Sequence, residues 1–250
     1  MTIITQIGGI AWLLALVVRR FTRRLLLPFL ALYIGVSVAA SVAAPMTGRV
    51  ALPCVDAGPD RIAVLHPIYC ALNRHYVRPE IAAYGDALAR HMDQRFPGTR
   101  TRALDGNFPF LDGFPLLPHL SHDDGEKLDL ALFYTDQRGT YQPGRARWFL
   151  GYWAYEQPRP GDRQPCTDVA GLSLRWDMER LQPLLRDWPL DEARNSEMLR
   201  WLAANPQGRD FRVLVEPHLQ ARLGAAGTAI RFQGCRAARH DDHLHLQFRP

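Results

Sequence analysis

The first 49 residues limit the fold of this 250-residue chain more than any other stretch. They hold two apolar runs, residues 3–18 and 25–44, which are separated by the basic segment RRFTRR at residues 19–24, and they contain no acidic residue. The second run has about the 20 apolar residues with which a helix crosses the hydrocarbon core of a bilayer. Residues 1–44 are therefore predicted to form a membrane anchor of one or two apolar segments.

The arginines of this segment predict its orientation. Basic residues that flank a membrane span stay on the cytoplasmic side, so the RRFTRR segment is expected there. Three arrangements are open: the second run spans alone, both runs span as a hairpin, or a signal peptide is cleaved near SVAAP at residues 41–45. In all three, residues 50–250 lie on the periplasmic, extracytoplasmic side. An uncleaved anchor, which is the arrangement expected here, lies in the inner (cytoplasmic) membrane.

The charge outside the anchor argues against a nucleic-acid partner. The chain has 30 Lys and Arg against 25 Asp and Glu, and five of the arginines lie in the first 49 residues, so the remainder is formally neutral. A neutral domain has no general electrostatic attraction for DNA or RNA. We therefore expect no nucleic-acid binding.

The cysteines are compatible with an oxidising compartment. None of the four, Cys54, Cys70, Cys166 and Cys235, is spaced from another as in the CxxC motifs of zinc ribbons or thioredoxin-like proteins. Outside the cytoplasm they can form up to two disulfides. The sequence leaves all three pairings open.

Beyond the anchor, the pattern of apolar residues predicts one domain. Residues 45–61 are rich in proline and glycine and are predicted to be a linker to a single domain over residues 62–250. Helical and strand patterns are mixed there without regular alternation, so we expect an α+β fold with a mainly antiparallel sheet flanked by helices. The predicted helices are 78–96, 176–188 with an interruption at Pro183, 191–204 and 217–224. The predicted strands are 99–105, 128–134, 148–155, 211–215, 230–232 and 243–248.

The last predicted strand carries a concentrated group of polar residues, in RHDDHLHLQF at residues 239–248. Side chains alternate between the two faces of a strand, so His243 and His245 share one face while Leu244 and Leu246 share the other and enter the core. Two histidines on one strand face can converge on a metal ion. A solvated strand face explains the same two residues equally well when they are considered alone.

A second cluster, SHDDGEKLDLAL at residues 121–132, contains His122 and Asp129 with six residues between them. Asp129 lies in an apolar strand, where burying a carboxylate is costly unless it is paired or bound to a cation. Two histidines and one carboxylate make a hydrolytic zinc site when a fourth position is left to water, whose pKa falls to about 7. Zn²⁺ is therefore the expected cofactor, and a nearby acid or base must move a proton to the leaving amine.

The order His-x6-Asp with an internal glycine, followed by His-x-His near the C-terminus, is similar to a group of zinc peptidases. This group joins lysostaphin-type enzymes and D-Ala-D-Ala metallopeptidases. HDDHLHLQF resembles most the C-terminal signature of the penicillin-insensitive murein endopeptidases, and VLVEPHLQARL at residues 213–223 resembles the strand and short helix before it. The resemblance covers residues 95–134 and 208–248, and the stretch between them does not align.

This resemblance implies both a function and a set of site residues. The implied residues are His122, Asp129 and His245 for the metal, His243 with His240 and Asp242 for catalysis, and Arg100 and Arg102 for the substrate. Asp242 stands where the D-Ala-D-Ala branch has a glutamate, which is one methylene longer. The implied function is hydrolysis of peptide bonds in peptidoglycan by a membrane-anchored endopeptidase or D,D-carboxypeptidase.

The same residues also bear on other classes of protein. The absence of G-x-S-x-G excludes a serine hydrolase of that type. A catalytically inactive descendant that binds or supports the cell wall stays open, as does a periplasmic metal-delivery protein. The presence of His243 beside the implied ligands favours an enzyme. His119 is predicted to be an ordinary loop residue, and the aromatic segment at 148–157 to belong to the core.

Overall fold

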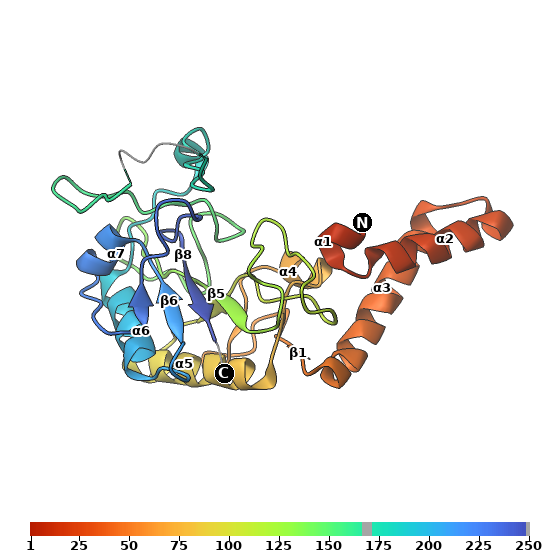
Figure 1. The fold of residues 1–250 in the computed structure, drawn as a ribbon, viewed down its shortest axis with the longest axis horizontal. Helices are drawn as coiled ribbons and strands as arrows, with labels where there is room; N and C mark the ends of the chain where they lie inside the picture. The colour runs from red at the N-terminus through yellow and green to blue at the C-terminus, as the bar shows by residue number, and fades with distance from the viewer. Residues whose placement is uncertain (167–171, 249–250) are drawn as a thin grey trace.

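A computed structural model describes residues 1–166 and 172–248, and its centre is a six-stranded sheet (Figure 1). In sheet order the strands are β2 (Ala63–Val64), β4 (Arg102–Ala103), β5 (Lys127–Ala131), β8 (His243–Gln247), β6 (Arg212–Leu214) and β7 (Ile230–Arg231). The three central pairings are antiparallel, whereas β2–β4 and β6–β7 are parallel. The expected α+β class is confirmed, and the sheet is mixed because a parallel strand is added at each edge.

One face of this sheet is covered by two helices, α5 (Pro79–Arg95) and α6 (Glu192–Ala204) (Figure 1). The strands place their leucines on this face. The core there includes Leu128, Leu130, Leu244 and Leu246 from the strands together with Ile81, Leu88, Met92, Met198 and Leu202 from the helices. Because strand side chains alternate, the residues between those leucines lie on the other face of the sheet. That face holds the candidate site.

The two covering helices begin where the sequence predicts. Pro79 occupies the first turn of α5, where its missing N–H costs nothing. Asp191 caps α6, because its carboxylate accepts a hydrogen bond from the Arg194 backbone N–H at 3.0 Å. The short helix α7 (Pro217–Arg222) likewise begins at a proline, as expected.

Three segments differ from the sequence-based expectation. Residues 176–188 form only a short 3₁₀ helix, Gln182–Leu184, since Pro183 cannot donate to a longer helix. Residues 148–155 form turns and bends and no strand. The expected linker packs into the domain: β1 (Val50–Ala51) pairs with β3 (Tyr76–Val77), and Leu52 is buried.

The N-terminal helices project from the domain (Figure 1). After the short α1 (Thr2–Thr5), α2 (Gly8–Thr22) and α3 (Leu26–Ala43) pack together through Ala11, Ala15 and Phe29. The helical segment Leu26–Thr47, which includes the 3₁₀ turn η1 (Ala44–Thr47), is long and apolar enough to cross a membrane, and only 11% of an 18-residue apolar stretch within it is buried. The helix also contacts the domain, because the Tyr33 hydroxyl donates to the Ala71 carbonyl at 2.6 Å.

Two disulfides decide the pairing that the sequence leaves open. Cys54 bonds to Cys70, and Cys166 bonds to Cys235. Disulfides persist in oxidising compartments. Together with the apolar N-terminal helix, they indicate an extracytoplasmic location for the domain.

Removing the Cys166–Cys235 disulfide with a double serine substitution is expected to lower the free energy of unfolding by about 2–5 kcal/mol. It joins cysteines 69 residues apart, whereas Cys54 and Cys70 are separated by 16, so its loss frees a longer loop in the unfolded chain. Thermal unfolding of detergent-solubilised protein, compared with the Cys54/Cys70 double variant, measures the difference. A larger loss for the shorter loop would contradict the loop-entropy explanation.

Candidate metal centre

The register of β5 and β8 brings two implied ligands together. Asp129 lies directly opposite His245 in the antiparallel pair, and the loop before β5 places His122 beside them. The His245 Nδ1 to Asp129 Oδ1 distance is 2.8 Å, His122 Nε2 to Asp129 Oδ1 is 3.3 Å, and His122 Nε2 to His245 Nδ1 is 3.1 Å. Tetrahedral ligands placed at zinc bond lengths are separated by about 3.3 Å. These three atoms therefore converge as the ligands of one zinc ion would.

The residues around the three atoms favour metal ligation. His122 and Asp129 are 0% exposed and His245 is 4% exposed. The second ring nitrogen of His122, Nδ1, lies 2.6 Å from the Gly106 carbonyl, which selects the tautomer whose Nε2 lone pair faces Asp129. The Tyr152 hydroxyl donates a hydrogen bond to Asp129 Oδ2 at 2.6 Å. The other carboxylate oxygen, Oδ1, is the one that contacts His122 and His245. Two imidazoles and one carboxylate fixed in this way fit Zn²⁺.

The pKa shifts reflect the same burial and charges. Burial raises the pKa of the Asp129 carboxyl, but His122, His243 and His245 lower it by more than burial raises it. The net pKa therefore lies well below the usual value. Burial lowers the pKa of His245 to about 4. For His122, burial lowers the pKa while Asp129 raises it, and the net shift is upward. The lowered pKa values of Asp129 and His245 favour the ionised carboxylate and the neutral imidazole, which are the forms that bind a metal.

His119, expected to be an ordinary loop residue, belongs to this cluster. Its Nδ1 lies 2.8 Å from Asp105 Oδ2 and 3.4 Å from Asp129 Oδ2, and with His122 and Asp129 it forms a group that could hold a metal ion. Arg74 binds both carboxylate oxygens of Asp105 at 2.6 Å, which fixes the partner of His119. The sequence signal that was missed is the spacing in PHLSH, which places His119 three residues before His122.

His243 faces the metal centre and is held there by its neighbour. Its Nδ1 lies 2.5 Å from Asp242 Oδ1, while its Nε2 lies 3.8 Å from Asp129 Oδ2. Burial lowers the pKa of His243, but the carboxylates of Asp242 and Asp129 raise it to about 9. The second oxygen of Asp242 accepts from the Trp153 backbone N–H. Asp242 is thus engaged with both His243 and the Trp153 backbone, and it holds the ring of His243 in place.

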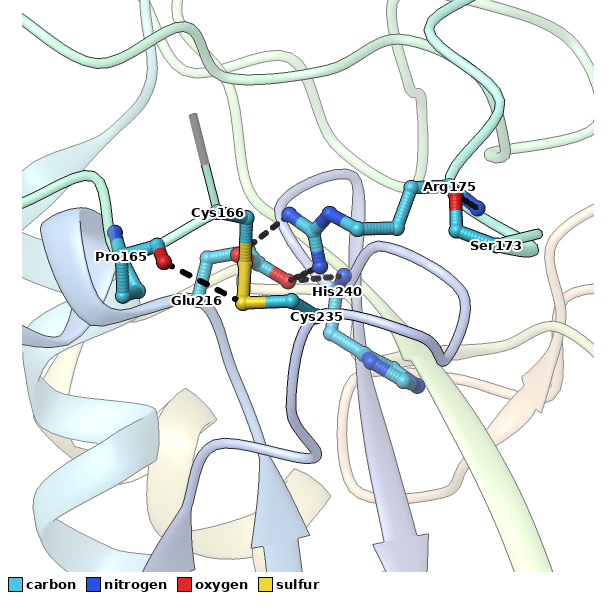
Figure 2. The surroundings of a disulfide bond; sticks show 7 residues. All are labelled: Pro165, Cys166, Ser173, Arg175, Glu216, Cys235 and His240. Atoms are coloured by element: carbon cyan, nitrogen blue, oxygen red, sulfur yellow. Dashed lines mark hydrogen bonds and ion pairs between the residues drawn. A yellow bond between two sulfur atoms is a disulfide. The ribbon is translucent and has the colours of Figure 1, made fainter. Parts of the chain in front are cut away.

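His240 lies beside both histidines of β8. The centroid of its ring is 5.1 Å from that of His243 and 5.6 Å from that of His245. Burial lowers its pKa well below the usual value, so this imidazole is neutral. Figure 2 shows how its backbone is held: His240 N–H donates to Glu216, and Arg175 binds both carboxylate oxygens of Glu216 at 2.8 and 3.1 Å. The Cys166–Cys235 disulfide lies beside this ion pair and ties the segment before Arg175 to the loop before His240 (Figure 2).

Arg100 and Arg102, the implied substrate residues, lie elsewhere. Both bind Asp56, at 3.1 and 3.0 Å, and both line a separate hollow that contains none of the clustered histidines. β4 pairs with β5 at Ala103 and Leu130. Arg102 therefore lies beside the part of β5 that follows Asp129. The structure does not bring these arginines to the metal centre.

The aromatic segment at 148–157 packs partly in the core, as expected, since Tyr152 belongs to the buried core cluster, and it also contributes to the site. Besides binding Asp129, the Tyr152 hydroxyl accepts a hydrogen bond from the Asp105 backbone N–H at 3.1 Å. Trp153 and Tyr155 line a hollow of about 70 Å³ that also contains His243. Sequence periodicity could not reveal this, because the segment has neither helix nor strand structure. Its only signal is the density of tyrosine and tryptophan.

Replacing Tyr152 with phenylalanine is expected to weaken zinc binding about 10–100-fold, as is typical when a residue that orients a ligand is lost. The ring volume is kept, and only the hydroxyl that binds Asp129 Oδ2 is removed. Zinc competition with a chromophoric chelator measures the change. Tyr141→Phe is the matched control, since that hydroxyl binds the Arg100 backbone and not a ligand. Equal zinc affinity in the two variants would show that Tyr152 has no part in the centre.

The fold and the site define an α+β protein with a buried, metal-capable cluster of histidine and aspartate residues, behind an N-terminal apolar helix. Comparison with protein-family models and with curated proteins gives no match for the chain.

Proposed function

We propose that this protein is a membrane-anchored, zinc-dependent peptidase that hydrolyses peptide bonds of peptidoglycan on the outer side of the membrane. One observation supports this most directly: His122 Nε2, Asp129 Oδ1 and His245 Nδ1 lie 2.8–3.3 Å apart, next to a histidine that is not needed as a ligand. The substrate class rests on the resemblance of the two motifs to murein peptidases.

The proposed chemistry assigns a separate task to each residue. Zinc bound by His122, Asp129 and His245 would polarise the peptide carbonyl and lower the pKa of a bound water. His243 Nε2 faces this position and can move a proton toward the leaving amine. Asp242 fixes the ring of His243 through Nδ1, so the proton-carrying nitrogen keeps its direction.

The surroundings of the site support access for a peptide. The hollow of about 70 Å³ beside His243 is lined by aromatic side chains, among them Trp153, Tyr155 and Trp176, and it borders His119. A centre that only stabilises the fold is normally closed by its own ligands. Here His243, which is held by Asp242, lies 3.8 Å from Asp129 and also lines the hollow, which favours catalysis over a purely structural metal.

The test is zinc content and hydrolysis measured on the same preparation of full-length protein in detergent. One tightly held zinc and cleavage of muropeptides, both lost with a chelator and restored by zinc, are expected. His245→Ala is the matched variant that should lose both. Tightly bound zinc without cleavage of any muropeptide, together with retention on isolated cell walls, would instead support the inactive wall-binding module.

A further inference from the structure

Before β5 the chain forms a long loop over residues 106–126, which carries His122 and which we call the ligand loop. The loop is closed on itself, since the Gly113 N–H donates to the Asp123 carbonyl at 2.8 Å. Its first residue also orients the ligand directly, because the Gly106 carbonyl lies 2.6 Å from His122 Nδ1. The position of His122 therefore depends on how this loop is held.

The N-terminal segment holds the start of the ligand loop through the backbone of residues 108–110. The three hydrogen bonds are Arg49 Nη1 to the Phe108 carbonyl at 2.7 Å, Thr47 Oγ1 to the Pro109 carbonyl at 2.8 Å, and the Phe110 N–H to the Gln6 side-chain oxygen at 2.9 Å. Figure 1 shows this yellow-green loop on the side of the domain that faces the N-terminal helices. Residues that were expected to serve only as anchor and linker thus contact the loop that carries a ligand.

Arg49 also contacts the other end of the ligand loop, at Gly125. The φ of this glycine is +83°, and a Cβ atom added there would lie 2.9 Å from Arg49 Nε and 3.3 Å from the side chain of Arg78. Gly125 is the internal glycine of the motif that joins His122 to Asp129. The guanidinium therefore packs against the backbone at a place where only a residue without a side chain fits.

The side chain of Arg49 is itself fixed in the protein interior. It is 1% exposed, and its charge is paired with Asp112 in the middle of the ligand loop. Its backbone N–H donates to the Ala44 carbonyl at 3.1 Å, and the next two residues form β1, which pairs with β3. A buried guanidinium is tolerated only when it is paired and hydrogen-bonded, and these partners all lie in the loop. Arg49 thus joins the start, the middle and the end of the ligand loop.

We propose that Arg49 is a positioning residue for the metal centre, which keeps the ligand loop closed and thereby holds His122 where it can bind the metal. The segment next to the anchor is then part of the centre and not only a tether. This inference rests on the proposed zinc-dependent function, to which it adds a residue that contacts neither the metal ligands nor a substrate.

The test compares the zinc affinity of full-length wild-type protein and of Arg49→Met in detergent, by competition with a chromophoric chelator. Methionine keeps an unbranched side chain but cannot donate to Phe108 or pair with Asp112. Zinc binding is expected to weaken about 10–100-fold, as when a residue that orients a ligand is lost. The visible absorption spectrum of Co²⁺ bound in place of zinc should also change, because it reports the ligand geometry of the protein that remains folded.

Arg222→Met is the matched control, since the Arg222 side chain is 6% exposed and pairs with Glu156 and Asp162 away from the ligand loop. It should keep the wild-type zinc affinity and Co²⁺ spectrum even if its stability falls. A second variant, Gln6→Ala with Thr47→Val, removes the other two hydrogen bonds to the loop and leaves Arg49 in place. It should show a smaller loss of zinc affinity.

The outcomes separate this inference from the function on which it rests. Wild-type zinc affinity and an unchanged Co²⁺ spectrum in Arg49→Met would overturn the positioning role. If Arg49→Met does not fold, unchanged zinc affinity in the Gln6→Ala and Thr47→Val variant would overturn it instead. Wild-type protein that binds no zinc would contradict the metal centre and the peptidase proposal themselves.

Discussion

Replacing Asp129 with alanine is expected to abolish both zinc binding and hydrolysis. Asp129 is fully buried and lies opposite His245 in the sheet, and its removal takes away the carboxylate oxygen that lies within 3.3 Å of both His122 Nε2 and His245 Nδ1. The loss of zinc affinity should exceed the roughly 100-fold effect of removing a residue that only orients a ligand. Metal analysis of purified protein after dialysis measures it directly.

The control for this variant is Asp123→Ala, which removes a partly buried carboxylate from the same loop without touching the cluster. It should keep zinc and activity. Tight, stoichiometric zinc in Asp129→Ala would overturn the ligand set of His122, Asp129 and His245, and with it the observation on which the proposed function depends.

Replacing His243 with glutamine is expected to leave zinc in place and to reduce kcat about 10²–10⁴-fold, the usual contribution of a positioned acid or base. His243 Nε2 is 3.8 Å from Asp129 Oδ2, and its Nδ1 is bound to Asp242, so its position is that of a proton-transfer group beside the ligands. Zinc content and steady-state rates on one muropeptide substrate separate the two roles.

His91→Gln is the matched control, because His91 binds Glu197 where α5 and α6 pack together, on the opposite side of the sheet from the metal centre. It should have wild-type rates. Two results would contradict the assignment of His243: a variant that loses zinc, which would make it a ligand, or a variant that hydrolyses the substrate at the wild-type rate.

Local sequence patterns, which involve residues only a few positions apart, predicted much of the fold. The alternation of β8 indicates which residues enter the core, because side-chain direction in a strand follows from its backbone period. The ends of α5 and α6 follow from Pro79 and from the Asp191 cap, which are local properties of the chain. Within 176–188 the helix, which was expected to be interrupted at Pro183, is reduced to the 3₁₀ turn Gln182–Leu184 that contains this proline.

The candidate site could be predicted only in part. The residues of two motifs suggested a metal, and the structure brings His122, Asp129 and His245 together. His119 was expected to be an ordinary loop residue and Tyr152 a core residue. Tyr152 does lie in the core, but the part of both residues in the site was missed, because their contacts with Asp105 and Asp129 join positions 14 and 23 residues apart. Arg100 and Arg102 were assigned by analogy, and the pairing with Asp56 that takes them elsewhere has no local signal.

Sequence alone was sufficient for those properties that depend on residue type and short spacing: an apolar N-terminal segment, an α+β domain, and histidines and an aspartate able to hold a metal ion. The fold was needed for the strand register that places Asp129 opposite His245, the disulfide partners, and the walls of both hollows. The physical reason is range. Backbone periodicity and capping act within a few residues, whereas a metal centre requires atoms more than 100 positions apart to meet within about 3.3 Å.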